Sequence, residues 1–186
     1  MFYKFKELVK KDSSYNVIPI NLNNKIDKEL IEELIKASQH LINSCEKVRR
    51  FYSRRINDLG GKIEPEIVDI LSKNTKCKRL GLKGYPDAEI FYKRRFYYLE
   101  IKTTTNWDSS FRSFYYTNPN KIKHNARHIL LGLKAEEEKD KYWKIIDHKI
   151  LDLYELKLYK KEEYNTSNSK LYEEELILNK GEIRRL

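Results

Sequence analysis

Two carboxylates and one ammonium group lie close together in the middle of the chain. Asp87 follows a proline, and after twelve intervening residues comes the tripeptide Glu100-Ile101-Lys102. Carboxylate oxygens are ligands that Mg²⁺ prefers, and a bound Mg²⁺ keeps several waters and takes a phosphate oxygen as a further ligand. A lysine beside such a metal holds a water or offsets charge that develops on the phosphate. These residue types therefore predict Mg²⁺-dependent phosphodiester hydrolysis, with Asp87, Glu100 and Lys102 as the catalytic centre.

The spacing of these residues suits a β-hairpin at the edge of a sheet. In a strand over residues 96–104, side chains alternate between the two faces, so Glu100 and Lys102 are neighbours about 7 Å apart along the strand. Ile101 lies between them and anchors the strand in the core. Asp87 stands just before the partner strand, so the hairpin brings it towards Glu100.

The segments around this hairpin predict a protein of mixed helices and strands. Runs of apolar and aromatic residues predict strands, and residues 93–95 between two of them predict a tight turn. The chain begins with helices, continues with a run of strands and ends in mixed elements. This order is typical of an α/β (α+β) fold around a central mixed sheet. The strands are predicted at residues 78–83, 88–92, 96–104, 111–116, 128–135 and 142–146.

One long helix is predicted ahead of the hairpin, over residues 27–59. Its apolar residues recur with the three-then-four spacing of a one-sided stripe. Asp27 is a suitable N-cap, and Gly60 and Gly61 end the pattern. A second helix is predicted to begin near Pro65, because proline is favoured in the first helical turn.

The chain is strongly basic, with 38 Lys and Arg residues against 28 Asp and Glu residues and a net charge of +10 at pH 7. A basic surface concentrates polyanions, of which nucleic acid is the commonest. Lys47, Arg50 and Arg54 share one face of the predicted long helix, where they either contact phosphates or form a solvated polar face. A second basic group surrounds the aromatic residues 114–116 and either contacts DNA or covers core aromatics with a solvated face. Its members are Arg112, Lys121, Lys123, His124 and Arg127.

The sequence also argues against several other kinds of site. Cys45 and Cys77 are far apart and lack a C-x-x-C spacing, so neither a zinc site nor a disulfide framework is expected. His124 and His128 lack the H-E-x-x-H context of a zinc helix, so we expect structural roles for both. There is no glycine-rich phosphate loop and no apolar run approaching about 18 residues. We therefore expect no nucleotide-driven motor and no membrane span, and we expect a cytoplasmic protein.

The pair Pro86-Asp87, followed by Glu100-Ile101-Lys102, resembles the signature of the PD-(D/E)XK nuclease superfamily. That superfamily includes type II restriction endonucleases and archaeal-type Holliday-junction resolvases. The resemblance implies a restriction-endonuclease-like core, a central mixed β-sheet flanked by helices, here with a long N-terminal helix. It implies a metal held by Asp87, Glu100 and the carbonyl of Ile101, with Lys102 serving the attacking water. The products would carry 5′-phosphate and 3′-hydroxyl ends.

The resemblance extends to a glutamate upstream of the hairpin. Members of the superfamily often carry a glutamate on the helix that precedes the catalytic hairpin, and residues 60–68 resemble that pattern. Glu64 matches best, and Glu66 is the alternative. Glu64 would hydrogen bond to a metal-bound water or help to hold a second metal. Its ordinary role would be an acid that complements the dipole at a helix N-terminus.

The resemblance implies a type II restriction endonuclease acting on double-stranded DNA. The chain is similar in size and plan to the small cleavage subunit of a heterodimeric type IIS enzyme, whose partner is a larger DNA-recognition subunit. A second copy of the chain is the other candidate partner. A Holliday-junction resolvase, a nuclease acting on RNA and a non-catalytic nucleic-acid-binding scaffold remain alternatives. We expect one nuclease domain over residues 1–186, with a helical part at 1–59, a catalytic core at 60–160 and a C-terminal extension at 161–186.

Overall fold

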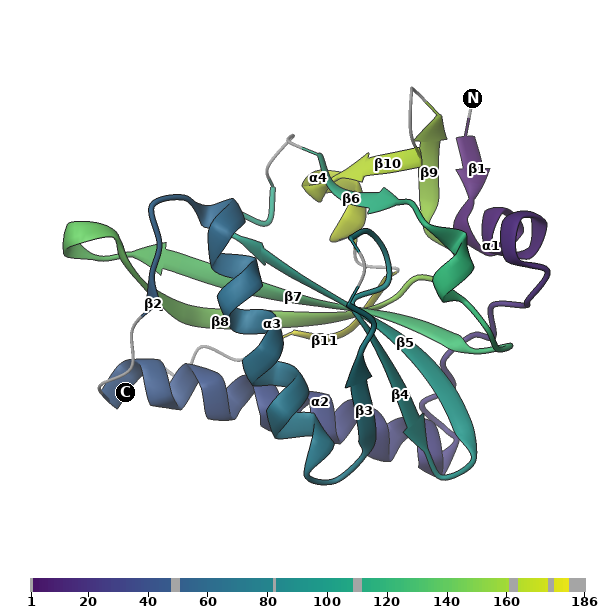
Figure 1. Cartoon of the computed structure of the whole chain (residues 1–186), viewed down its shortest axis with the longest axis horizontal. Coiled ribbons are helices and arrows are strands. Elements are labelled where there is room, and N and C mark those ends of the chain that lie inside the picture. The colour runs from purple at the N-terminus through teal and green to yellow at the C-terminus, as the bar shows by residue number, and fades with distance from the viewer. Residues whose placement is uncertain are drawn as a thin grey trace.

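A mixed seven-stranded sheet forms the centre of the protein (Figure 1). The computed structural model describes residues 2–47, 51–81, 83–108, 112–160, 164–173 and 176–180, and of residues 112–113, 160, 164–168 and 180 it describes the backbone only. Within these residues β5 and β7 pair in parallel, and the other pairs are antiparallel. In spatial order the strands are β11 (Ile177–Lys180), β8 (Tyr142–Asp152), β7 (Arg127–Glu137), β5 (Arg95–Thr104), β4 (Ala88–Tyr92) and β3 (Lys76–Arg79), with β2 (Phe51–Tyr52) paired to β8.

A smaller antiparallel sheet joins segments from the beginning, the middle and the later part of the chain. Its order is β1 (Phe2–Lys4), β9 (Lys157–Lys160), β10 (Tyr164–Ser167) and β6 (Arg112–Tyr116). Three short helical segments connect the strands, namely η1 (Pro119–Lys121), η2 (Lys139–Lys141) and α4 (Asn168–Leu171). Residues of the expected C-terminal extension therefore enter both sheets, as β10 and β11.

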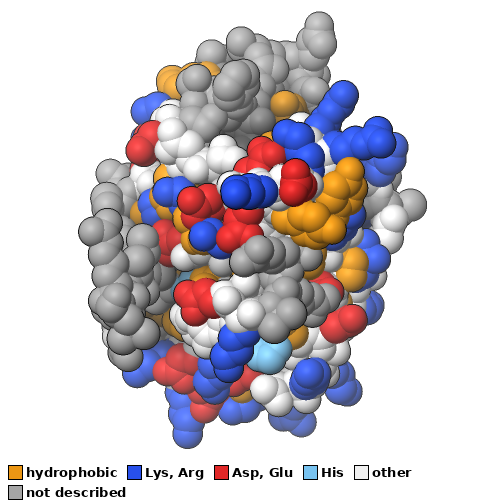
Figure 2. All heavy atoms as spheres, turned by 90° about the vertical axis from the view of Figure 1, so that its left-hand side faces the viewer, with side chains coloured by type: hydrophobic (Ala, Val, Ile, Leu, Met, Phe, Trp, Pro, Cys, Tyr) orange, Lys and Arg blue, Asp and Glu red, His pale blue; other side chains and the backbone are white. Residues whose placement is uncertain are grey.

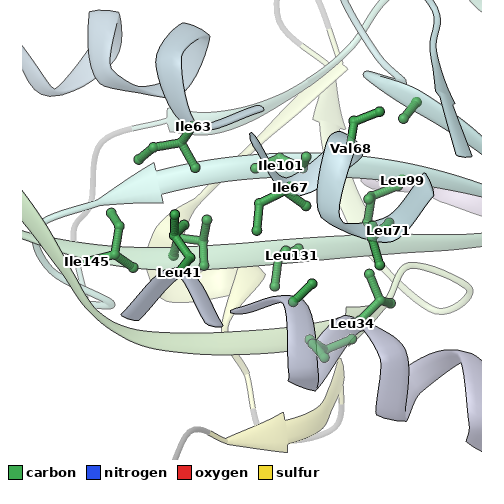
Figure 3. Packing of buried hydrophobic residues seen from close by; sticks show 14 of the residues in the cluster. Leu34, Leu41, Ile63, Ile67, Val68, Leu71, Leu99, Ile101, Leu131 and Ile145 are labelled. Atoms are coloured by element: carbon green, nitrogen blue, oxygen red, sulfur yellow. The ribbon is translucent and has the colours of Figure 1, made fainter. Parts of the chain in front are cut away.

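Two helices cover one face of the central sheet. They are α2 (Lys25–Lys47) and α3 (Ile56–Ser72), and their apolar stripes pack against alternate residues of the strands. Figure 3 shows Leu34 and Leu41 of α2 and Ile67 of α3 around Leu131 of β7 and Ile101 of β5. The predicted mixed sheet with flanking helices is thus confirmed.

The opposite face of the central sheet packs against α1 (Phe5–Ser13) and the smaller sheet. Phe5 lies at the centre of this second core, with its ring edge-on to the rings of Tyr85, Phe114 and Tyr116. These aromatic pairs add specific geometry to the burial of large apolar surfaces. The second core lies on the sheet face to which Tyr98, Glu100 and Lys102 point, so the candidate catalytic side chains lie at its side.

The hairpin between β4 and β5 follows its prediction closely. β4 covers the predicted range, and β5 begins one residue before it. Lys93 and Arg94 have φ values of 45° and 66°, so a two-residue turn of the kind that matches strand twist connects the strands despite the lack of Asn-Gly. The other expected strands at residues 128–135 and 142–146 are present as the longer β7 and β8, while β3 and β6 occupy 76–79 and 112–116.

The prediction of one helix over residues 27–59 is wrong. α2 ends at Lys47, β2 follows, and α3 begins at Ile56, so Gly60, Gly61 and Pro65 lie inside a helix rather than between two helices. The N-cap also differs, because Asn24 Oδ1 accepts a hydrogen bond from the N–H of Ile26 at 3.0 Å. No helix in the described ranges is long and apolar enough to cross a membrane.

Candidate active site

The β4–β5 hairpin places Asp87 beside the tripeptide Glu100-Ile101-Lys102. The ladder between the strands ends at the pair Ala88 and Leu99. Asp87 lies one residue beyond this pair, and its side chain continues the hydrogen bonding along β5. Its Oδ2 accepts a hydrogen bond from the N–H of Ile101 at 2.8 Å. The N–H and C=O of one residue point to the same side of an extended strand. The carbonyl of Ile101 therefore faces the side on which Asp87 lies.

Glu100 and Lys102 form an ion pair next to Asp87. Lys102 Nζ lies 2.7 Å from Glu100 Oε1, and the side chain of Glu100 is only 2% exposed. The second oxygen, Oε2, is buried and has no hydrogen-bond partner within the described part of the chain. A buried carboxylate oxygen without a partner is energetically costly. Oε2 is therefore a position where a ligand of the carboxylate is expected.

Burial sets the electrostatics of the three residues. It raises the pKa of Glu100 to about 7, with Asp87 adding to the rise and Lys102 opposing it. It also raises the pKa of Asp87, against the effects of Lys102 and the Ile101 N–H. Burial lowers the pKa of Lys102, but the charges of Glu100 and Asp87 more than offset this, so the pKa is raised. An added cation would favour the ionised form of both crowded carboxylates, because burial and neighbouring negative charges raise their pKa values.

Lys121 lies under the turn that carries Asp87. Lys121 is only 7% exposed. Its Nζ donates one hydrogen bond to the carbonyl of Gly84 and another, at 2.7 Å, to the carbonyl of Pro86. Burial lowers the pKa of Lys121, while Asp87 and Glu100 act to raise it. The sequence predicted a DNA contact for Lys121, whereas its described contacts are with the backbone of the turn.

The two candidate glutamates on α3 occupy different positions. Glu64 Oε1 accepts a hydrogen bond from Arg79 Nε at 2.8 Å, at the end of β3. Its charge contributes to the pKa shifts of both Asp87 and Lys102. Glu66 lies two residues further along the same helix. The geometry therefore favours Glu64 as the helix residue that acts on the centre.

The residues predicted to bind DNA do not share one environment. Arg54 and Lys123 are exposed. His124 stacks on Phe96 with 3.6 Å between ring centroids, and its Nε2 lies 3.7 Å from Glu89. Arg50 lies outside the described residues, and of Arg112 only the backbone in β6 is described.

Arg127 is held in a buried ion-pair network centred on Asp27. Its Nε lies 2.8 Å from Asp27 Oδ2, while Arg95 and Tyr97 donate to Oδ1 at 2.8 and 2.7 Å. The Asp27 side chain is fully buried, so this network joins α2 to β5 and β7. These contacts indicate a structural role for Arg127 in the described fold.

The expected basic face of the long helix does not form, because α2 ends at Lys47 and Arg54 follows β2. Figure 2 shows the end of the molecule that lies on the left in Figure 1. Among the described residues on that face, basic side chains intermingle with acidic ones. At the turn between β7 and β8, Lys141 forms an ion pair with Glu137, and Lys144 forms one with Glu136.

Two further residues beside the centre were not identified from the sequence. Arg79 pairs with Glu64, and Tyr172 lies over Gly132 of β7 on the sheet face that carries Lys102. A glycine inside a strand often marks the close approach of another group. Gly132, within the strand predicted at residues 128–135, was therefore a signal of such a close approach, although it did not identify Tyr172.

The donor set of the centre fits a hard divalent cation. No group of three or more His, Cys, Asp or Glu side chains within the described ranges is arranged to hold a metal ion. Mg²⁺, however, is usually held by one or two carboxylates, with waters and substrate phosphate as the other ligands. Asp87, the unpartnered Oε2 of Glu100 and the carbonyl of Ile101 provide such a set.

Comparison with known proteins identifies the family of this chain. The type II restriction enzyme MjaV family matches residues 2–175, a span that contains Asp87, Glu100 and Lys102. The type II restriction enzyme MjaV of Methanocaldococcus jannaschii is 34% identical over 207 residues, which cover 97% of this chain and 89% of the relative. The chain therefore belongs to the type II restriction enzyme MjaV family.

Proposed function

We propose that this chain is a type II restriction endonuclease that hydrolyses DNA with Asp87, Glu100 and Lys102 as its PD-(D/E)XK centre. Family membership supports the activity. The observation that carries the choice of residues is the buried Glu100, with Oε1 paired to Lys102 and Oε2 unpartnered beside Asp87 in the described structure. A structural ion pair alone would leave no reason to bury a second, unsatisfied carboxylate oxygen.

Mg²⁺ is the cofactor that we propose for this centre. Asp87, Glu100 and the carbonyl of Ile101 would hold it, since they offer hard oxygen ligands on one side of the hairpin. When bound, the ion supplies Lewis-acid polarisation of the phosphate and activation of a water. Binding would also offset the cost of burying Glu100 and Asp87 as carboxylates.

Lys102 serves the attacking water in this proposal. Because its pKa is raised, it stays an ammonium group at neutral pH and acts as a hydrogen-bond donor and positive charge rather than as a base. Glu100 fixes the position of Nζ through Oε1. Water forms the new bond to phosphorus and the 3′ oxygen leaves, which yields 5′-phosphate and 3′-hydroxyl ends. Glu64 would assist by hydrogen bonding to a water in the centre.

Double-stranded DNA is the proposed substrate, and cutting both strands in one binding event would need two centres. The described part of the chain contains one set of Asp87, Glu100 and Lys102. A second copy of the chain, or a larger recognition subunit with its own centre, would cut the other strand. We propose Arg54, Lys123 and His124 as contacts to DNA because they are at least partly exposed, and Arg50 and Arg112 as further candidates.

The test is cleavage of supercoiled plasmid with and without Mg²⁺. Asp87→Ala removes one proposed metal ligand, and Asp69→Ala removes an exposed carboxylate of α3 as the matched control. We expect Mg²⁺-dependent cleavage by wild type and by Asp69→Ala, and none by Asp87→Ala. Cleavage that appears only after a lysate of the source cells is added would identify a partner-dependent subunit. Equal cleavage by Asp87→Ala and wild type would contradict the proposed centre, and absence of cleavage with every divalent metal would favour a non-catalytic scaffold.

A further inference from the structure

Arg79 lies at the edge of the central sheet, next to the turn that carries Asp87. β3 is the last strand of the sheet within the described residues, and it runs beside α3 (Figure 1). Arg79 is the final residue of β3 and pairs with Ala88 of β4. The next residue, Leu80, donates its N–H to the carbonyl of Asp87 at 2.8 Å. The backbone of Arg79 is therefore one residue away from a direct bond to a proposed metal ligand.

The side chain of Arg79 is linked to the centre through Glu64. Its Nε donates a hydrogen bond to Oε1 of Glu64 at 2.8 Å. The charge of Glu64 acts in turn on Asp87, Lys102 and Lys121, and in each case it acts to raise the pKa. Glu64 is therefore close to three charged residues of the centre. The guanidinium that binds it lies at the margin of the same group.

The guanidinium of Arg79 has donors left for a second anion. An arginine carries five N–H donors in a planar fork, and the bond to Glu64 uses the one on Nε. The two terminal nitrogens form the edge of the fork that binds phosphate in a bidentate manner. The side chain is 49% exposed, so DNA can approach it from solvent. An ion pair this exposed adds little to stability, so stability alone gives little reason for an arginine at this position.

Arg79 is more accessible than the two lysines of the centre. The side chain of Lys102 is 30% exposed and pairs with Glu100. Lys121 is buried, and its Nζ is bonded to two backbone carbonyls. The carboxylates of the two metal ligands and of Glu64 repel the phosphates of an approaching DNA strand, each of which carries a negative charge. An accessible cation at the margin offsets this repulsion, and Arg79 provides one.

We propose that Arg79 is a substrate-binding residue whose guanidinium holds a phosphate of the DNA backbone next to the one that is cleaved. This inference rests on the proposed function, because it requires DNA in the centre. The neighbouring phosphate is chosen because Arg79 contacts Glu64 rather than the metal ligands in the described structure. Nε keeps its bond to Glu64, and the terminal nitrogens bind the phosphate. Such a contact positions the strand relative to Asp87 without reading its sequence.

Arg79→Gln removes the charge of this side chain and keeps it polar. The ends of the fragments from the wild-type plasmid digest identify the cleaved site, and a synthetic duplex with that site is the probe. In Ca²⁺, Arg79→Gln should bind this duplex about 10-fold more weakly, the loss expected for one hydrogen bond between charged groups. The slope of log affinity against log salt concentration should fall by about one, because one phosphate contact is lost.

The matched control is Arg94→Gln, which removes an exposed arginine from the turn at the far end of the β4–β5 hairpin. The control should bind the duplex with the affinity and the salt dependence of wild type. Both variants should keep the melting temperature of wild type, because both side chains are exposed.

A set of duplexes with one neutral methylphosphonate each locates the contact. The neutral group replaces one phosphate at a time on either side of the cleaved bond. At one position it should weaken binding by wild type and leave Arg79→Gln unchanged, so that the ratio of the two affinities falls towards one. At the other positions the ratio should stay as it is on the unmodified duplex. An arginine that only supports the fold would give the same ratio at every position.

The Glu64→Gln background separates a contact with DNA from an effect through Glu64. Arg79→Gln should weaken binding by the same factor in this background as in wild type. A loss that disappears in this background, wild-type affinity in Arg79→Gln, or a constant ratio on all duplexes would each overturn the inference. These results would leave the proposed function intact, since wild type still cleaves. Absence of metal-dependent cleavage by wild type would overturn both.

Discussion

Glu100 and Lys102 form an ion pair on one face of β5, with 2.7 Å between Oε1 and Nζ. The two residues are separated only by Ile101, whose side chain points into the opposite core. A strand of period two thus builds the pair without help from any distant element. The remaining components of the centre come from the turn before β4 and from α3.

The first prediction concerns the ammonium group of Lys102. Lys102→Ala should lower the cleavage rate by about 10²- to 10³-fold, as expected for the loss of one preorganised charge at the reacting phosphate. Binding of DNA in Ca²⁺ should change little, because the group acts mainly on the transition state. Lys28→Ala, which removes an exposed lysine of α2, is the control. Loss of DNA binding that accounts for the whole defect would contradict this role.

The second prediction concerns metal binding and stability. Mg²⁺ should raise the melting temperature of wild type, because a ligand that binds only the folded state stabilises it by mass action. Asp87→Asn should abolish the shift by removing one charged ligand, while Asp69→Asn on the exposed face of α3 should keep it. Thermal melts over a Mg²⁺ titration measure the effect. An equal shift in both variants would contradict a metal held by Asp87.

The catalytic hairpin is well predicted from the sequence because its order is local. Alternation of apolar and polar residues specifies β5, and the proximity of Asp87 to Ile101 follows from the hairpin. The continuity of the first helix was mispredicted because long-range packing overrides helix propensity there. Phe51 is buried opposite Trp143, and Trp143 Nε1 donates to the carbonyl of Ser53 at 2.8 Å, contacts that require an extended segment.

Buried charges were the least predictable part of the site. Arg127 and Lys121 were predicted from the sequence to contact DNA. The partners that they bind in the structure are far away in the sequence, so no local pattern indicated them. Asp27 binds Arg127, and the backbone of Gly84 and Pro86 binds Lys121. A basic residue gives no local sign of whether it points to solvent or to a buried acceptor. Net charge therefore predicts a partner class better than it predicts individual contacts.

The third prediction tests which role Lys121 has. Lys121→Met should lower the melting temperature and slow cleavage, because the carbonyls of Gly84 and Pro86 lose their donor and the turn before Asp87 loosens. We expect a loss of about 1–3 kcal/mol in unfolding free energy. Lys123→Met, an exposed neighbour, should leave stability unchanged and weaken DNA binding in a salt-dependent way. Normal stability with weakened DNA binding in Lys121→Met would instead support the contact predicted from the sequence.

The fourth prediction compares two glycines. Gly132→Ala should destabilise the protein by about 1–3 kcal/mol and slow cleavage, since the new methyl group collides with Tyr172. Gly61→Ala should stabilise it by about 0.5–1 kcal/mol, because Gly61 lies in α3 and a Cβ there meets nothing within 4 Å. Urea unfolding and cleavage assays on both variants provide the measurement. Full activity and stability in Gly132→Ala would contradict the tight seat of Tyr172.

The last prediction concerns acid sensitivity through His128. His128 is fully buried, its Nδ1 lies 2.6 Å from the Tyr85 hydroxyl, and burial lowers its pKa to about 3. The unfolded chain takes up a proton below about pH 6.5 while the folded protein does not, so this residue costs stability as the pH falls. The unfolding free energy of wild type minus that of His128→Gln should therefore decrease by about 1.4 kcal/mol per pH unit below that point.

Glu100 and Asp152, whose pKa values are raised to about 7 and about 6, make the unfolding free energy change with pH in the opposite direction. Both proteins contain these two residues, so their contribution cancels in the difference. The same substitution at His40, on the exposed side of α2, is the control and should leave the slope of wild type unchanged. A difference that does not vary with pH would show that His128 is protonated in the folded protein.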